Sequence, residues 1–199
     1  MLICYATVGR HADCLKLQWE ALAARRRVLP PDHPDTLNTL WRIAASLVKL
    51  NRGGEAIPVI DECFPLAAGK AVDPELILKL LSLRLDHFQK AGDPTGCRTT
   101  AEMWEKLNRI DADSLYDAAC YRAVAATVQA KTSGVAATRL ATEDADRAMV
   151  WLNRAVAAGN RHREHMEKDT DLDFLRNRAD FQKLVASLPY LAPPPRPVR

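Results

Sequence analysis

The chain has 199 residues, 48% of them hydrophobic, and a formal net charge of +3 at neutral pH. This length suits one or two domains and is enough to bury roughly 70% of the surface of the unfolded chain, so a core without covalent staples is expected. The net charge is too small to indicate nucleic-acid binding, and no run approaches the roughly 20 apolar residues of a membrane span. We therefore expect neither nucleic acid nor membrane as a partner.

Cysteine usage points to a reducing compartment. The five cysteines are odd in number, contain no C-x-x-C pair, and mostly stand where a helical face needs a small apolar residue; they are Cys4, Cys14, Cys63, Cys97 and Cys120. Such cysteines are typical of reduced cores. The first residues, from Met1 to Tyr5, lack the basic start of a signal peptide. We expect a cytoplasmic location.

The first predicted element is a long helix over His11 to Leu29, preceded at Leu2 to Val8 by the end of a truncated helix. Pro30-Pro31 ends the long helix, because proline removes a backbone donor and disfavours helix in the residue before it. The run Arg25 to Arg27 near its end is expected to complement the helix dipole. The apolar face of this helix is predicted to contain Cys14, Leu17, Ala21, Leu22 and Val28.

A helical pair follows at Leu37 to Leu50 and Gly54 to Ala68. The stretch Asp32 to Thr36 is expected to form a turn and to cap the first helix with an acidic or hydroxyl side chain, and Pro58 is placed in the first turn of the second helix, where proline is tolerated. The predicted packing positions are Leu40, Ile43, Ala44, Leu47, Ala56, Ile60 and Cys63.

One pattern repeats between these two segments. Cys14 and Ala56 hold equivalent places 42 residues apart, and so do Ala21 and Cys63. A fixed period in this range is typical of stacked helical hairpins, which bury their apolar faces against their neighbours.

Two further pairs complete the pattern. Asp73-Pro74 starts a helix with Leu81, Leu85 and Phe88 as its apolar stripe, Gly92-Asp93-Pro94 turns the chain, and Ala101 and Trp104 belong to the next helix. The fourth pair is predicted at Ser114 to Ala130 and Glu143 to Ala158. Between them, Lys131 to Thr142 is rich in Thr, Ser, Gly and Ala, and we expect an exposed, mobile loop there.

Two stretches resemble known families. The run V-L-P-P-D-H-P-D-T-L-N-T-L from Val28, followed by N-R-G-G-E-A from Asn51, resembles the tetratricopeptide (TPR) repeats of the kinesin light chain type. The first linker glycine of that pattern is replaced by Pro30, and its G-R-Y turn by Asn51-Arg52-Gly53. The stretches Leu115 to Ala125, Asp146 to Asn160 and Asp169 to Leu184 resemble the carboxy-terminal TPR region behind serine/threonine kinase domains of planctomycete-type bacteria, with Thr170 departing from the D-x-D-L-D core.

The resemblance implies an all-α fold, a right-handed α-α superhelix of about four hairpins at residues 1–29, 36–68, 74–108 and 113–158. A helical cap at residues 166–188 would close the open end of the array, with its apolar side chains at Leu172, Leu175, Phe181, Leu184 and Val185. Residues 189–199 form a proline-rich tail that is expected to be extended.

Catalytic motifs are missing from this sequence. It contains no G-x-G-x-x-G, H-R-D or D-F-G, so no residues cradle phosphates or hold magnesium in the manner of a kinase. His162 and His165 are the best metal candidates, but they lack the spacing of H-E-x-x-H; His33 has no second ligand nearby. Cys120 stands in an alanine-rich helix, where a buried and inert thiol is expected. We predict no cofactor, no metal and no enzymatic activity in this chain.

The resemblance also implies a concave groove that binds protein or peptide. In TPR arrays the groove residues follow a fixed spacing on the first helix of each pair, and this chain offers aromatic and amide side chains that suit an extended peptide. The partner-binding candidates are Asn38, Trp41, Lys79, Ser82, Asp86, Gln89 and Tyr116. The alternative for Trp41 and Tyr116 is packing between helices.

The sequence supports three hypotheses about the function of the chain. The first is a protein-binding scaffold attached to a bacterial serine/threonine kinase. The second is a self-association module that forms a homodimer through the apolar face left open by the truncated first repeat. The third is a metal-dependent enzyme that uses the His162 to His165 stretch or the cysteines.

Overall fold

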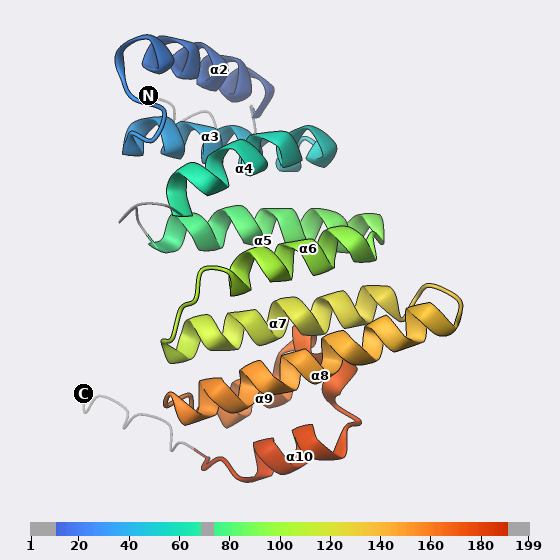
Figure 1. Cartoon of the computed structure of the whole chain (residues 1–199). Helices are drawn as coiled ribbons and strands as arrows, with labels where there is room; N and C mark the ends of the chain where they lie inside the picture. The colour runs from blue at the N-terminus through green and yellow to red at the C-terminus, as the bar shows by residue number, and fades with distance from the viewer. Residues whose placement is uncertain (1–10, 69–73, 191–199) are drawn as a thin grey trace, which may run out of the picture. The chain divides into compact units, whose positions relative to one another are not determined.

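Helices make up all the regular structure in the described part of the chain, residues 11–68 and 74–190 of the computed structural model (Figure 1). The predicted all-α class is confirmed. The helices are α2 (His11–Val28), α3 (Pro34–Lys49), α4 (Gly53–Ala68), α5 (Pro74–Ala91), α6 (Pro94–Glu105), α7 (Ala112–Gln129), α8 (Val135–Ala157), α9 (Arg163–Lys168), the 3-10 helix η1 (Thr170–Leu175) and α10 (Ala179–Ala186). None of the helices in these two ranges is long and apolar enough to cross a bilayer.

The chain forms two compact units, Met1–Ala91 and Gly92–Arg199. We call them the N-terminal and C-terminal units. Their boundary falls in the turn between α5 and α6, where Gly92 has a φ of +67° that glycine adopts without strain. These two helices are predicted from the sequence to form one hairpin, and that pairing stays a prediction.

The core of the N-terminal unit lies between α3, α4 and α5. Helix α3 packs against α2, α4 and α5, and α4 packs against α5. The predicted packing positions are confirmed, because none is more than 2% exposed: Leu40, Ile43, Ala44, Leu47, Ala56, Ile60 and Cys63. Burying a Leu or Ile side chain stabilises a protein by roughly 1.5–3 kcal/mol, so these positions determine how the three helices pack.

Helix α2 buries only part of the predicted stripe: Cys14 and Leu22 are buried as predicted, and Ala21 is half-buried. Leu17 is 36% exposed and Val28 is 78% exposed, whereas Leu15 and Gln18 are buried beside Cys14. Cys14, Gln18 and Leu22 are spaced by four residues and share one helical face, so the buried stripe turns away from Leu17 and Val28 and includes Leu15 and Gln18. Beyond this stripe, two basic residues tie α2 to its neighbours: Arg25 donates to the carbonyl of Asp35 at 2.9 Å and to the hydroxyl of Thr39, and Arg26 pairs with Glu62 at 2.5 Å.

The start of α3 differs from the expected acidic or hydroxyl cap. His33 is the N-cap, and its Nδ1 accepts a hydrogen bond from the backbone N–H of Asp35 at 3.1 Å, with Pro34 as the first helical residue. A ring nitrogen here satisfies one of the orphan donors of the helix. His33 therefore has a structural role. The expected cap at Asp73 lies outside the described residues.

The prolines of α4 also differ from expectation. Pro58 lies beyond the first turn of α4, and Pro65 is a second proline inside the same helix. Each removes one backbone hydrogen bond. Burial of the apolar face of α4 compensates, since Val59, Ile60 and Cys63 pack into the core around them.

The turn into α4 requires glycine at one position only. A Cβ on Gly53 would lie 2.3 Å from Nδ1 of His87, whereas a Cβ on Gly54 would meet no atom within 4 Å. We expect Gly53→Ala to lower the free energy of unfolding by about 1–3 kcal/mol, because the His87 ring must move. Gly54→Ala is the matched control, and we expect it to raise stability by about 0.5 kcal/mol. Urea unfolding of both variants checks this; equal effects would contradict the contact with His87.

The C-terminal unit is built around α7, which packs against α6, α8 and η1. Trp104 lies on α6, as predicted; it is buried, and its indole N–H donates to the carbonyl of Ser114 at 2.8 Å. Asp111 caps α7 by accepting from the N–H of Ser114 at 2.8 Å. Figure 1 shows α7 and α8 running side by side along most of their length.

The loop predicted at Lys131 to Thr142 is wrong in extent. Helix α7 ends at Gln129 and α8 begins at Val135, so only residues 130–134 connect them. Residues 135–142 belong to this helix, because Ala137 and Ala141 lie on the face that is buried and alanine has the highest helix propensity. Composition alone cannot distinguish an alanine-rich loop from an alanine-rich helix extension.

The predicted cap residues are largely buried in the C-terminal unit. Leu172 and Leu175 are fully buried, Phe181 and Val185 are 4% and 6% exposed, and Leu184 is half-buried. Helix η1 packs on α7, and α10 packs on α8 and α9. The D-x-D-L-D stretch is structural, since Asp169 caps η1 by accepting from the N–H of Asp171 at 3.0 Å.

Candidate functional site

Six of the seven predicted partner-binding residues lie in the N-terminal unit, on the neighbouring helices α3 and α5. Asn38 and Trp41 are one turn apart on α3. On α5 the candidates are spaced three, four and three residues apart, which places them on one helical face. We call this surface the α3–α5 face; it consists of Asn38, Trp41, Lys79, Ser82, Asp86 and Gln89.

Trp41 and Lys79 connect the two helices of the α3–α5 face. The ammonium of Lys79 lies 5.5 Å from the centroid of the Trp41 ring, and Lys79 also pairs with Glu75 at 2.7 Å. A cation–π contact at such a site contributes about 0.5–1 kcal/mol. The Trp41 ring is half-buried, whereas Ile43 and Ala44 on the same helix are fully buried. Part of the ring therefore meets solvent.

The polar members of the α3–α5 face are open to solvent. Asn38, Ser82 and Gln89 are exposed, and the Asn38 carbonyl accepts only a long bond of 3.3 Å from Arg42. Asp86 pairs with Lys90 at 2.6 Å on the surface. Exposed ion pairs of this kind contribute about 0–1 kcal/mol, so a ligand group can replace them at little cost.

Tyr116 lies in the C-terminal unit and is covered by the chain itself. It is 7% exposed, its hydroxyl donates to Oδ2 of Asp169 at 2.7 Å, and its ring lies 5.4 Å from that of His165. Burial and the neighbouring Cys120 and Asp169 raise the pKa of Tyr116 well above its usual value. A ligand can contact this ring only after the segment that carries Asp169 has moved.

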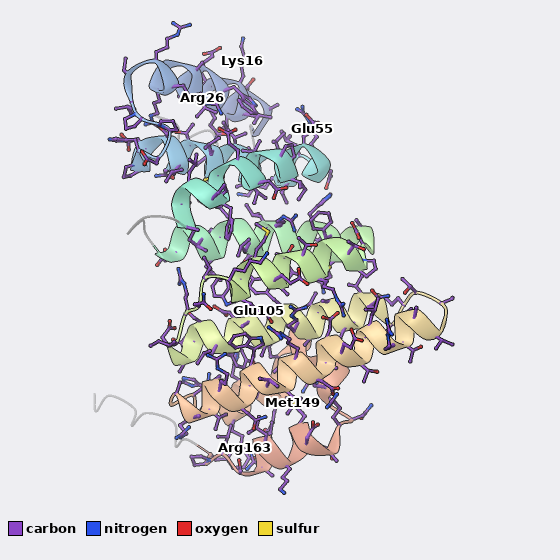
Figure 2. The ribbon with its side chains drawn as sticks, viewed as in Figure 1. Lys16, Arg26, Glu55, Glu105, Met149 and Arg163 are labelled. Carbon is purple, nitrogen blue, oxygen red and sulfur yellow. The ribbon has the colours of Figure 1, made fainter. Side chains whose placement is uncertain are left out.

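The C-terminal unit contains a buried charge cluster that was not predicted from the sequence. Arg122 of α7 donates to both carboxylate oxygens of Glu105 on α6 at 2.8 Å and to Asp144 on α8 at 2.8 Å. The three side chains are each less than 10% exposed. Arg147 and Trp151 of α8 also donate to Glu105, the latter at 2.6 Å. Glu105 is labelled in Figure 2.

The charge cluster fixes the packing of three helices. Burial alone would raise the pKa of Glu105, but the bonds from Arg122, Arg147 and Trp151 outweigh it and lower the pKa to about 2. The folded pKa lies below the unfolded value of 4.5, so this stabilisation is present above pH 4.5 and is lost as the pH falls towards 2.

A lone arginine within the alanine-rich run Ala118 to Ala126 was the signal in the sequence that could have revealed this buried cation.

A cavity of about 700 Å³ opens beside this cluster, and charged and polar side chains line it. Several of its charged residues are already paired: Arg98 donates to Asp144 at 3.0 Å and lies 3.6 Å from Glu143. Glu105 and Asp144 accept from arginines that remain charged at any ordinary pH, so these two carboxylates hold the helices together.

The cysteines do not form a reactive site in the described residues. Burial, together with Glu62, raises the pKa of the Cys63 thiol to about 12, and burial followed by the charge of Asp169 raises the pKa of Cys120 well above its usual value. Cys14, Cys63, Cys97 and Cys120 are all buried and unbridged, as predicted. A thiol without accessible thiolate is not a nucleophile.

His162 and His165 line a second cavity, of about 350 Å³, with Glu164, Lys168 and Tyr190. His165 lies 3.5 Å from Asp169. Across the part of the chain that the structure describes, no three His, Cys, Asp or Glu side chains are grouped so as to hold a metal ion. The apolar face invoked for self-association involves residues 1–10, which lie outside the described residues, so the homodimer stays a prediction.

Comparisons with known proteins give one structural similarity. No family model matches the chain, and no curated protein matches it in sequence. Among solved structures, it is similar to a kinesin light chain protein of Podospora anserina with nearly identical TPR-like repeats, at 16% identity over 93% of this chain and 92% of that chain, with a TM-score of 0.47. This similarity assigns no residue of this chain a functional role. Membership of the tetratricopeptide family stays a prediction from the sequence.

Proposed function

We propose that the chain is a non-catalytic protein-binding scaffold and that the α3–α5 face holds an extended peptide. The observation that supports this most is the half-buried Trp41 ring under the ammonium of Lys79. An aromatic ring whose position is fixed before binding supplies contact area at low entropic cost. The amides of Asn38 and Gln89, both exposed, can bond the backbone of a peptide.

The charges of the α3–α5 face suggest how a ligand is recognised. Lys79 and Asp86 carry opposite signs on one helix, and each already has an exposed partner. A face of mixed sign does not select strongly for a charged ligand, and salt screens exposed charges. We therefore expect recognition by shape and backbone contacts, with only a modest effect of salt on affinity.

Trp41→Ala tests the binding role. A peptide is first selected from a random library against the full chain, and its affinity is measured by calorimetry. We expect Trp41→Ala to weaken binding by about 30-fold or more, since losing a true anchor costs about 2 kcal/mol or more. Lys79→Ala is the matched variant from the same contact, and we expect a loss of about fivefold or less.

Thermal unfolding of Trp41→Ala is the control for folding. A core tryptophan replaced by alanine costs about 3–5 kcal/mol, whereas a ring that serves the surface costs much less. A fall in melting temperature of the size expected for a core residue would show that Trp41 holds the helices together. In that case the α3–α5 face would not be the binding surface.

We further infer from the sequence resemblance that this scaffold accompanies a bacterial serine/threonine kinase and recruits a protein partner for it. The resemblance at Leu115 to Ala125 and Asp169 to Leu184 supports this association. The full open reading frame tests it directly: an upstream kinase domain is expected, and an open reading frame without one would remove the kinase from the proposal but leave the binding face untouched.

A further inference from the structure

Helices α6 and α8 of the C-terminal unit border the cavity of about 700 Å³ described above, which we call the α6–α8 cleft. Two contacts fix the register of the helices along it. Arg98 of α6 donates to Asp144 of α8 at 3.0 Å, and Glu105, at the end of α6, accepts from Arg147 of α8 at 3.1 Å. The two helices therefore run in the same direction, and residues late in α6 lie beside residues late in α8.

Charge is distributed unequally along the α6–α8 cleft. Its first part contains acidic side chains: Asp144 pairs with Arg98 at 3.0 Å, and Glu143 lies 3.6 Å from the same guanidinium. Glu102 follows Arg98 by one helical turn. Among the described residues that line the cleft, Glu105 is the only carboxylate beyond Glu102. Negative charge therefore belongs mainly to the beginning of the cleft.

Cations gather at the other end, beside the ring of Trp151. The guanidinium of Arg154 lies 4.2 Å from the centroid of this ring. Arg147 precedes Trp151 by four residues and Arg154 follows it by three, so the three side chains share one face of α8. Lys106 lines the cleft directly after Glu105. We call Lys106, Arg147 and Arg154 the basic end of the cleft.

The three cations of the basic end retain hydrogen-bond donors for a ligand. Lys106 and Arg154 are exposed, and neither side chain forms a hydrogen bond or an ion pair within the described part of the chain. Arg147 is 57% exposed and donates to Glu105 through Nε and Nη2, which leaves Nη1. Contacts with Trp151 and Glu105 hold the two guanidiniums in place before a ligand arrives, so little side-chain entropy is lost on binding.

Carboxylates near the basic end are already engaged. Glu105 accepts from Arg122 at 2.8 Å, which offsets its charge, and Glu102 lies 4.0 Å from the same arginine. Arg109 is the next cation along the chain, and the nearby Asp111 offsets its charge. The excess of positive charge is therefore carried by the basic end itself.

We propose that the basic end of the α6–α8 cleft binds an acidic segment of a protein partner. Arg147 and Arg154 are seven residues apart on α8, which separates them by about 10 Å along the helix axis. An extended segment rises about 3.3 Å per residue, so carboxylates two or four residues apart, on one side of the segment, reach both guanidiniums. Arginine binds a carboxylate through two parallel hydrogen bonds.

The charges around the basic end favour a protein segment over nucleic acid. The chain has a formal net charge of only +3, and Glu102 and Glu143, whose side chains are 45% and 51% exposed, would repel a continuous phosphate backbone that follows the cleft. A segment with a few carboxylates can occupy the basic end alone. This surface lies within the C-terminal unit, so the inference does not depend on the α3–α5 face.

Fluorescence anisotropy of the full chain at low salt tests the proposal. The probe is a short labelled peptide of alternating glutamate and glycine, and the same peptide with glutamine is the uncharged control. We expect the glutamate peptide to bind and the glutamine peptide not to bind. Raising the salt concentration should weaken binding markedly, because the contacts are made by exposed charges. At the α3–α5 face the expected effect of salt is only modest.

Arg154→Gln and Arg139→Gln form a matched pair of variants. Both remove one exposed arginine from α8, but Arg139 lies at the other end of the helix, where it is 74% exposed and 3.5 Å from Glu143. We expect Arg154→Gln to weaken binding of the glutamate peptide about tenfold, the loss of one charge-assisted hydrogen bond. Arg139→Gln should change it by about twofold or less. Circular dichroism checks that both variants are folded.

Three results would overturn the proposal. The first is no binding of the glutamate peptide by the native chain at low salt. The second is an equal loss of affinity in Arg154→Gln and Arg139→Gln, which would show diffuse attraction to the whole of α8. The third is tighter binding of a labelled single-stranded oligonucleotide than of the glutamate peptide, which would assign the basic end to nucleic acid.

Discussion

Replacing Arg122 by alanine is expected to lower the free energy of unfolding of the C-terminal unit by about 3–5 kcal/mol. The loss is large because Glu105 and Asp144 would remain buried, at 8% and 3% side-chain exposure, without the cation that bridges them. Breaking a buried ion pair from one side leaves an uncompensated charge, which costs far more than the net contribution of the pair. Urea unfolding followed by circular dichroism measures the effect.

Arg147→Ala is the matched control for this prediction. Arg147 donates to the same carboxylate of Glu105 but is 57% exposed, so water can replace it. We expect a loss of about 1 kcal/mol or less. If the two variants lost equal stability, Arg122 would not be the bridge between α6 and α8.

Leu172→Ala is the second change with a large expected effect, about 2–5 kcal/mol. Leu172 is fully buried, and η1 packs it against α7. Removing it loses the transfer free energy of its side chain and leaves a cavity between η1 and α7. Thermal unfolding of the full chain measures the loss.

Leu184→Ala is the matched control for Leu172→Ala. It shows whether the loss of stability is specific to Leu172 or follows from removing any leucine of the predicted cap. Leu184 was predicted as an equivalent cap residue but is only half-buried, so we expect about 1 kcal/mol or less. A larger loss for Leu184 than for Leu172 would mean that α10, and not η1, closes the C-terminal unit.

The sequence predicted the fold where periodicity was strong. The 42-residue period located Ala56 and Cys63 correctly, because each of these positions must be small or apolar to let two helices approach. Prediction from the sequence failed where one local pattern is compatible with two structures, as at helix caps and in alanine-rich segments. His33 caps α3 although aspartate and threonine are nearby, and the alanine-rich residues 135–142 are helix.

The candidate site was harder to predict, because it depends on which helices meet. Spacing places Lys79 and Asp86 on one face of α5, but only the structure brings the ammonium of Lys79 over Trp41. Tyr116 has the same spacing on α7, yet Asp169, 53 residues later, lies on it. The Arg122 cluster joins three helices and leaves no local pattern beyond a single arginine among alanines.

Peptide binding by the α3–α5 face can be mapped residue by residue. The most direct test is chemical-shift mapping by NMR of the isotope-labelled chain, titrated with the peptide selected against it. We expect the largest changes in chemical shift at the Trp41 indole N–H and at the backbone amides of Lys79, Ser82 and Gln89. The amides of the exposed residues of α4 should keep their chemical shifts. Shifts confined to α4 or to the C-terminal unit would contradict the claim and place the binding surface elsewhere.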